Sequence, residues 1–362
     1  MDVSLQQTSA MDVKPPVTSV GVLGWVRQNL FNGPLNSILT IVVVLVLVRI
    51  VPPLFKWALV DSLWTSSGAA CKATTGACWS VLTHNARFIL FGFYPHDQQW
   101  RPLCCVILIV GLFLYTRSPN RWSKGLAIAW GVSLVAMGIL MPGGVLGLQP
   151  VEPGQWSGIS LTLLLSLFGL TVAYPLGVIL ALGRRSRLPA IKAMSVLYIE
   201  LIRGVPLISM LFMASVMFPL FLPEGITVNK ILRAQAAIIL FTAAYIAEVV
   251  RGGLQAVPRG QYEAAESLGL DYYQKMRLII LPQALKIVIP PTVGILVSAF
   301  KDTSLVVIIG LFDLLKTTQV TLSNPEWMGF STEAFLFIAV LYFLGCFSMS
   351  SFSRRLEKAL AR

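Results

Sequence analysis

The chain has 362 residues, of which 56% are hydrophobic and 12% are charged, and its formal net charge is +12. Soluble domains carry about 25% charged residues, so this composition excludes an ordinary soluble protein. Several apolar runs reach the roughly 20 residues that a helix needs to cross a bilayer. A transmembrane β-barrel would show alternating polarity instead. The sequence therefore predicts an all-α, polytopic membrane protein.

About eight stretches qualify as transmembrane helices, and polar or Gly/Pro-containing segments separate them. The expected spans are residues 35–55, 102–117, 124–142, 158–182, 194–222, 231–250, 284–310 and 333–352.

Lys and Arg are concentrated in alternate segments between these spans. With a cytoplasmic N-terminus, most of the 28 basic residues fall in the inside segments 1–34, 118–123, 183–193 and 251–283 and in the tail from residue 353. Because basic loops stay in the cytoplasm, this distribution predicts that both termini are cytoplasmic. It also explains the positive net charge without a nucleic-acid partner.

Two of the five cysteines, Cys71 and Cys78, lie in the polar loop 56–101, which is expected to face outward. A disulfide between them is possible in an oxidising compartment, and two free thiols are the alternative. No cluster of His and Cys has the spacing of metal ligands, so no metal site is expected.

A composition break near residue 150 divides the chain. Residues 142–157 form a Gly/Pro-rich connector. Residues 1–150 are predicted to contain an N-terminal cytoplasmic segment, an outer loop and a three-helix accessory membrane module. Residues 151–362 hold five expected spans with charged or proline-bearing stretches and are predicted to form the working core.

The loop at residues 251–283 is long and has helical character of its own. Pro258 ends the preceding helix, and Gly269 is suited to the left-handed C-cap of a first short helix. Asp271 is suited to the N-cap of a second one, which Pro282 is expected to close. A loop with this much structure is either a solvated connector or a surface that docks on a partner.

The triplet Glu263-Ala264-Ala265, followed by Gly269 and by Leu281-Pro282, resembles the EAA loop of ABC importer permeases. The resemblance implies a five-helix type I importer core in which this loop couples the permease to a cytoplasmic ABC ATPase dimer. Glu263, Ala264, Ala265, Gly269, Leu281 and Pro282 are then the coupling residues.

Four further segments are similar to the core helices of permeases of the polar amino-acid uptake family, and together the likeness covers about residues 155–352. They are Thr162 to Arg185, Glu200 to Leu207, Ala244 to Gly252, and Lys301 to Leu305.

The three-span extension, WRP at 100–102 and GACWSV at 76–81 further resemble the M-type subunit of the general L-amino-acid transport system. This likeness implies a subunit of the bacterial inner membrane that takes up L-amino acids. It also implies a heterodimer with a Q-type permease and a periplasmic amino-acid-binding protein that delivers the substrate.

The span 284–310 is predicted to hold the substrate site. Pro290 and Pro291 cannot both lie inside a regular helix, and a polar group interrupts the same span again. Broken helices and charged residues at membrane depth mark transport sites. A zwitterionic amino acid needs both signs of charge, and the candidates are Lys301, Asp302, Thr303 and Ser304. Alternatively, Lys301 and Asp302 neutralise other buried charges.

Two carboxylate–guanidinium pairs occur at i, i+3 spacing, Glu200 with Arg203 and Glu248 with Arg251, and each pair can meet on one helix face. They are interpreted as structural or gating ion pairs, with a kink after Arg203. The candidates for this role are Glu200, Arg203, Gly204, Pro206, Tyr245, Glu248 and Arg251.

Three functions remain to be compared. A permease subunit of an ATP-driven importer accounts for the cytoplasmic helix pair. An ATP-independent amino-acid or ion carrier or channel explains the intramembrane charges and leaves that pair without a role. An enzyme is not expected, because the chain has no phosphate-binding loop or catalytic motif. No cofactor is expected on this chain, and ATP and Mg²⁺ would be used by the partner ATPase.

Overall fold

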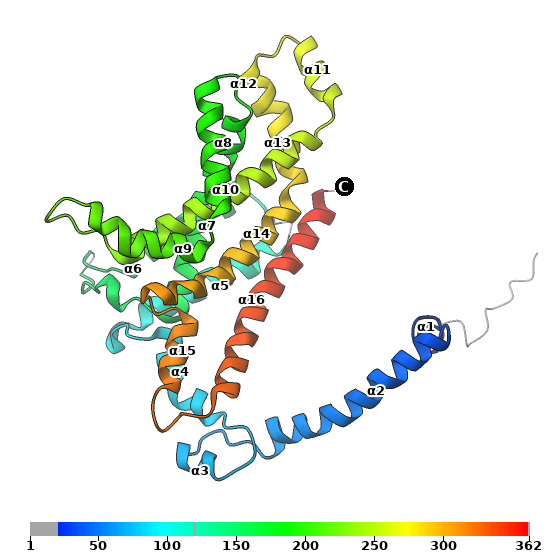
Figure 1. Cartoon of the computed structure of the whole chain (residues 1–362), viewed down its shortest axis with the longest axis vertical. Coiled ribbons are helices and arrows are strands. Elements are labelled where there is room, and N and C mark those ends of the chain that lie inside the picture. The colour runs from blue at the N-terminus through cyan, green and yellow to red at the C-terminus, as the bar shows by residue number, and fades with distance from the viewer. Residues whose placement is uncertain (1–20, 119–120, 146, 361–362) are drawn as a thin grey trace, which may run out of the picture. The chain divides into compact units, whose positions relative to one another are not determined.

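The computed structural model describes residues 21–118, 121–145 and 147–360, which are mostly helical (Figure 1). The predicted cytoplasmic N-terminal segment lies partly outside the described residues. The chain divides into two compact units, Met1–Cys78 and Trp79–Arg362. This division differs from the predicted module boundary at residue 150, which stays a prediction.

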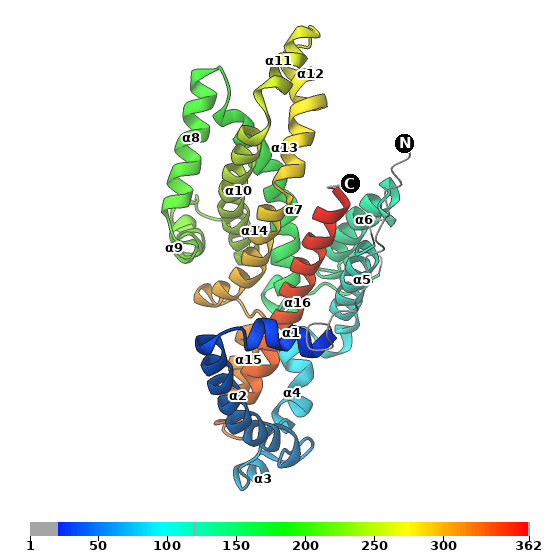
Figure 2. The same cartoon turned by 90° about the vertical axis from the view of Figure 1, so that its right-hand side faces the viewer.

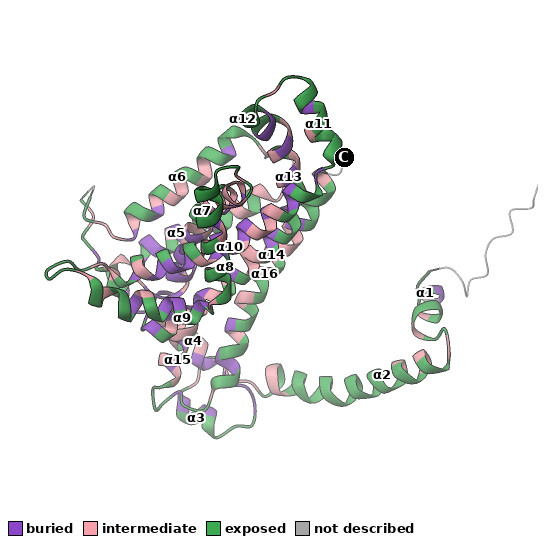
Figure 3. Ribbon diagram, turned by 45° about the horizontal axis from the view of Figure 1, so that its top comes forward, coloured by how far each residue is buried: buried purple, intermediate pink, exposed green. Residues whose placement is uncertain are grey.

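The first unit is built around one long apolar helix. It contains α1 (Gly21–Leu30), α2 (Pro34–Phe55) and the short α3 (Gly68–Lys72). No residue of α2 is buried, as its colouring in Figure 3 shows, and its exposed side chains are mainly Val, Leu and Ile. An apolar helix with all its faces exposed is expected to contact lipid.

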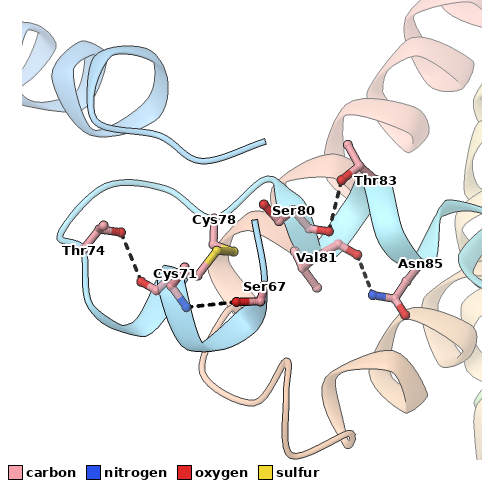
Figure 4. Close-up of a disulfide and its surroundings, with 9 residues drawn as sticks. Ser67, Cys71, Thr74, Cys78, Ser80, Val81, Thr83 and Asn85 are labelled. Carbon is pink, nitrogen blue, oxygen red and sulfur yellow. Dashed lines mark hydrogen bonds between the residues drawn. A yellow bond between two sulfur atoms is a disulfide. The ribbon is translucent and has the colours of Figure 1, made fainter. Parts of the chain in front are cut away.

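A disulfide between Cys71 and Cys78 joins α3 to the chain that follows it (Figure 4). The two Cα atoms are 5.6 Å apart, within the range that a disulfide spans. The Ser67 side chain caps α3 by accepting the N–H of Ala70, and Thr74 Oγ1 donates to the Cys71 carbonyl at 3.1 Å. Of the two states that the sequence leaves open, the structure has the bonded one.

The second unit is a helical bundle that contains the other helices. They are α4 (Ser80–Phe91), α5 (Trp100–Thr116), α6 (Lys124–Leu140), α7 (Gly158–Arg184), α8 (Pro189–Gly204), α9 (Leu207–Phe212), α10 (Lys230–Ala256), α11 (Arg259–Ser267), α12 (Tyr272–Lys275), α13 (Leu281–Ile287), α14 (Ile289–Asp302), α15 (Leu314–Leu322) and α16 (Ser331–Leu360).

Within the described part of the chain, six helices are long and apolar enough to cross a membrane. They are Pro34–Val60, His96–Thr116, Gly158–Arg184, Lys230–Ala256, Ile289–Ile309 and Ser331–Ala359. The predicted span 194–222 is instead a pair, α8 and the segment from Leu207 to Phe221, bent by 103°. The predicted span 124–142 is α6, an apolar helix of 17 residues.

The centre of the second unit is the contact of α7 with α10. Small residues recur every fourth position along α7, at Gly169, Ala173, Gly177 and Ala181. A Cβ at Gly177 would lie 2.6 Å from Cγ2 of Ile246 on α10, so only glycine permits this approach. Because lipid tails are as apolar as side chains, close packing of small residues is a main source of helix association in a bilayer.

The number of cysteines that react with a thiol reagent tests whether the disulfide is present. We expect maleimide to label the three free cysteines of the SDS-denatured chain, and all five cysteines after reduction. The physical reason is that a disulfide is a covalent bond, which unfolding in SDS does not break without a reductant. In a Cys71→Ser control, the same number of sites should react with and without reductant. Labelling of all five in the unreduced wild type would show that the pair is not bonded.

Candidate functional site

The segment that carries the Glu-Ala-Ala triplet is a helix–turn–helix. α11 ends at Ser267, and Gly269, two residues later, has a left-handed φ of 72°. The amide of Gly269 donates to the Glu266 carbonyl, and that of Leu270 donates to the Ala265 carbonyl. These two bonds form a Schellman motif, which requires glycine at the left-handed position. The predicted C-cap is therefore present in the structure.

The second helix begins as the sequence predicts and ends differently. Asp271 caps α12 in a capping box with Gln274. Pro282, which was expected to close this helix, instead lies in the first turn of α13, and the chain stays helical through it. The intervening residues Met276–Ile280 form a π-helical turn. A π-turn shifts the hydrogen-bond pattern, so a proline without an N–H is tolerated there.

The coupling candidates differ in exposure. Glu263 and Ala264 are exposed at the surface of α11, whereas Ala265 is buried. Glu266 accepts a hydrogen bond from Lys275, which joins α11 to α12 and lowers the pKa of this carboxyl below its usual value. Leu281 is half-buried and Pro282 is exposed at the start of α13. The loop thus has its own internal contacts and leaves Glu263 accessible.

Exposed apolar side chains surround the same tip. The exposed fractions are 76% for Leu268, 66% for Tyr273 and 63% for Leu278. Aromatic and aliphatic side chains that cluster on an otherwise polar loop are typical of a protein–protein contact.

Arg185 and Tyr262, neither of which was predicted as a site residue, attach this loop to the bundle. Arg185, just after α7, donates to the Leu254 carbonyl at 3.0 Å and to the Tyr262 hydroxyl at 3.1 Å. Tyr262 on α11 also donates to the Leu254 carbonyl at 2.8 Å. The ends of α7, α10 and α11 are therefore joined by one set of hydrogen bonds.

α13 is attached to α10 as well. A Cβ at Gly253 would lie 2.8 Å from the Ala284 carbonyl oxygen, so the glycine lets the two helices touch. Gln283 donates to the side chain of Gln261 on α11 at 3.1 Å.

The predicted pair of Glu200 with Arg203 is wrong in detail. Among the described residues, Glu200 pairs with Arg184 at 2.8 Å, and Arg203 pairs with Glu248 at 3.6 Å. The i, i+3 spacing of Glu200 and Arg203 permits contact, but each side chain instead pairs with a group on another helix, the Arg184 guanidinium on α7 and the Glu248 carboxylate on α10. Arg184 is the residue that the sequence analysis missed, and its only signal was a basic residue at the end of a span.

Glu248 is the centre of this charge network. Its carboxylate accepts two hydrogen bonds from Arg251, as the i, i+3 spacing predicts, and it lies 3.5 Å from Arg184. It therefore faces guanidinium groups from the ends of α7, α8 and α10. One half-buried carboxylate among three cations holds these helix ends together electrostatically.

The kink predicted after Arg203 corresponds to the 103° bend between α8 and the following segment. Gly204 ends α8, and Pro206 is the N-cap of α9, where its missing N–H interrupts the helix. The Arg203 guanidinium lies 5.8 Å from the centre of the Tyr245 ring. Tyr245 thus lies beside both the charge network and a cavity.

This cavity, of about 420 Å³, lies between α10 and α14. Its lining consists of Phe241, Thr242, Tyr245, Pro291, Gly294, Ile295, Ser298, Ala299 and Asp302. The volume falls in the range of small-molecule sites, and the lining is apolar with a few polar groups.

Only one of the four substrate candidates, Asp302, lines the cavity. Lys301 is exposed and is not part of the lining. The hydroxyls of Thr303 and Ser304 donate to carbonyls of their own chain, those of Phe300 and Lys301. The proline break is present, since α13 ends at Ile287 and α14 begins at Ile289 with Pro290 in its first turn. Among the described residues, no group of His, Cys, Asp or Glu could hold a metal.

The charge network around Glu248 predicts which of two carboxylate substitutions destabilises the protein more. Glu248→Gln leaves Arg203 and Arg251 without a carboxylate, and we expect it to lower the free energy of unfolding by about 2 kcal/mol. Glu200→Gln is the matched control, because Glu200 is more exposed and contacts one guanidinium. Thermal unfolding in detergent measures both, and an equal or larger loss for Glu200→Gln would contradict this role of Glu248.

Comparisons with known proteins agree with this geometry. Residues 173–362 match the family model described as binding-protein-dependent transport system inner membrane component. The inner membrane amino-acid ABC transporter permease protein YhdY of Escherichia coli is 48% identical over 92% of both chains. The glutamate/glutamine/aspartate/asparagine transport system permease protein BztC of Rhodobacter capsulatus is 38% identical over 100% of this chain and 99% of its own.

A solved structure, described as an amino acid ABC transporter with histidines, matches 56% of this chain and 92% of its own, at 30% identity and a TM-score of 0.50. The relatives are permeases, and in such systems a separate subunit hydrolyses ATP. This chain is therefore a membrane component and not the ATPase. It belongs to the family of inner-membrane components of binding-protein-dependent transport systems, the permease subunits of ABC importers.

Proposed function

We propose that this chain takes up L-amino acids from the periplasm by coupling ATPase closure to alternating access. The observation that carries this proposal is the exposed tip of α11 with Glu263, held rigidly to α7 and α10 by Arg185 and Tyr262. The amino-acid substrates named for the relatives support the substrate class.

The proposed assembly follows from the same features. A cytoplasmic ABC ATPase dimer, which uses ATP and Mg²⁺, binds the loop 251–283, and a homologous Q-type permease completes a heterodimer. A periplasmic amino-acid-binding protein delivers the substrate. We propose that the chain lies in the bacterial inner membrane with both termini in the cytoplasm. The Cys71–Cys78 disulfide supports this topology, because disulfides persist in the oxidising periplasm.

The contacts suggest how motion is transmitted. A displacement of α11 by the ATPase acts on the Leu254 carbonyl at the end of α10 through Tyr262 and Arg185. α10 also supplies Phe241, Thr242 and Tyr245 to the cavity wall. A rigid-body shift of this helix against α14 would therefore reshape the cavity.

For the substrate, we infer that the Asp302 carboxylate binds the ammonium group from inside the cavity. Lys301 is the proposed partner of the substrate carboxylate, although it lies outside the lining, because its long side chain is exposed next to Asp302. Thr303 and Ser304 are proposed to position this turn, since their hydroxyls bond to its carbonyls.

The coupling proposal predicts that Glu263→Lys prevents ATPase docking and leaves the bundle folded. Among the described residues the Glu263 side chain makes no ion pair, so its charge reversal breaks none. Copurification of the ATPase and substrate-stimulated ATP hydrolysis measure the effect. Glu224→Lys, at an exposed residue between α9 and α10, makes the same charge change as a control. Normal hydrolysis by the Glu263→Lys complex would contradict the proposal.

The substrate proposal predicts that Asp302→Asn raises KM for uptake about tenfold or more, because the substitution removes one charge-assisted hydrogen bond to the substrate. The melting temperature should stay close to that of the wild type. If Asp302 instead neutralises a bundle charge, the variant would melt lower with KM unchanged. Asp97→Asn, at an exposed residue of the 3₁₀ turn His96–Gln98, should change neither quantity. Uptake that continues without the ATPase would favour an ATP-independent carrier.

A further inference from the structure

A basic cavity lies where the end of α5 meets the last turns of α16, and its lining shares no residue with the loop 251–283 or with the cavity of Asp302. Its volume is about 420 Å³, and four of its seven lining residues are cationic. The lining consists of Leu114, Arg117, Ser118, Arg121, Arg355, Lys358 and Ala359. Figure 2 shows the end of α16, marked C, on the side of the bundle where α5 and α6 lie.

The four cations have no anionic partner within the described residues. None of the ion pairs there includes Arg117, Arg121, Arg355 or Lys358. Glu357, which lies between two of them in sequence, accepts a hydrogen bond from Ser353 and is not part of the lining. Four like charges around one cavity repel each other, and a bound anion would relieve this repulsion.

An apolar surface continues from the cavity along both helices. On α5, Ile107, Val110 and Leu114 are exposed at helical spacing and lead to Arg117 and Ser118. On α16, the exposed residues Val340, Leu344 and Phe347 lead in the same way to Arg355. The polar cavity thus lies at one end of an exposed apolar face that suits acyl chains.

Aromatic residues place the cavity at the membrane surface. The Trp122 indole donates to the Thr116 carbonyl at 2.9 Å, and its ring lies 6.1 Å from that of Phe352. Tryptophan at the end of a span is typical of the headgroup region. The Arg121 guanidinium lies 4.8 Å from the centre of the Tyr115 ring, which holds it at this level.

The cavity is at the same end of the bundle as the coupling loop. α14 starts beside that loop, and Phe300 near its far end packs 5.3 Å from Tyr342 in the first half of α16. α16 therefore runs back toward the loop, as Figure 1 shows. With the topology of the proposed function, the cavity faces the cytoplasmic leaflet.

We propose that this cavity binds the phosphate-bearing headgroup of an anionic phospholipid, with its acyl chains along the exposed faces of α5 and α16. Arginine binds phosphate oxygens in a bidentate manner, and three arginines with one lysine can neutralise more than one phosphate charge. Basic pockets between transmembrane helices on the cytoplasmic side are suited to such headgroups. The adjoining apolar faces favour a lipid over a soluble anion.

Native mass spectrometry of the purified complex tests this proposal by counting bound lipids. We expect a lipid with two phosphates, cardiolipin, to bind more tightly than phosphatidylcholine. Arg355→Gln should weaken cardiolipin binding about tenfold, because the substitution removes one charge-assisted contact with the headgroup. Arg354→Gln is the matched control, because Arg354 lies outside the lining and donates to Ser350. Unchanged melting temperatures would show that both variants are folded.

Three results would overturn the proposal. Equal weakening by Arg354→Gln would mean that general surface charge, and not this cavity, attracts the lipid. Displacement of bound cardiolipin by inorganic phosphate would identify a site for free phosphate. Loss of the ATPase from Arg355→Gln with an unchanged lipid count would assign the cavity to a protein partner. The lipid count does not depend on transport, so a failed coupling proposal would leave this result interpretable.

Discussion

The close packing of α7 against α10 is the constraint on which the rest of the second unit depends. Small residues along α7 let the two backbones approach, and a Cβ at Gly177 would collide with Ile246. In a bilayer, such packing replaces the hydrophobic effect that assembles soluble cores. Since both helices extend over 27 residues, their ends form a fixed base for the loop beyond them.

That base is held by two kinds of polar contact. The Glu248 carboxylate lies among guanidinium groups from three helix ends, and Arg185 with Tyr262 joins α11 to the Leu254 carbonyl. Hydrogen bonds to charged groups are stronger than neutral ones and depend on direction. They therefore restrain sliding between these helix ends more than apolar packing alone would.

Different segments of α10 thus contribute to different parts of the permease core. α10 contributes Phe241 and Tyr245 to the cavity wall, Glu248 to the charge network, and the Leu254 carbonyl to the hydrogen bonds with Arg185 and Tyr262. The basic cavity between α5 and α16 is the proposed site for an anionic lipid headgroup. Support from lipid at that position would stabilise the bundle independently of the ATPase.

Local chemistry in the sequence determined the helical membrane class, the glycine turn at Gly269, the cap at Asp271 and the proline break at Pro290. Each of these depends on backbone geometry or on hydrophobicity over neighbouring residues. Only the tertiary structure decided which charges pair and which polar residues line a cavity. Glu200 contacts Arg184 rather than Arg203 because the packing of the bundle brings the end of α7 beside α8. Helix periodicity predicts which residues share a face, whereas the packing of the helices determines which side chains that face contacts.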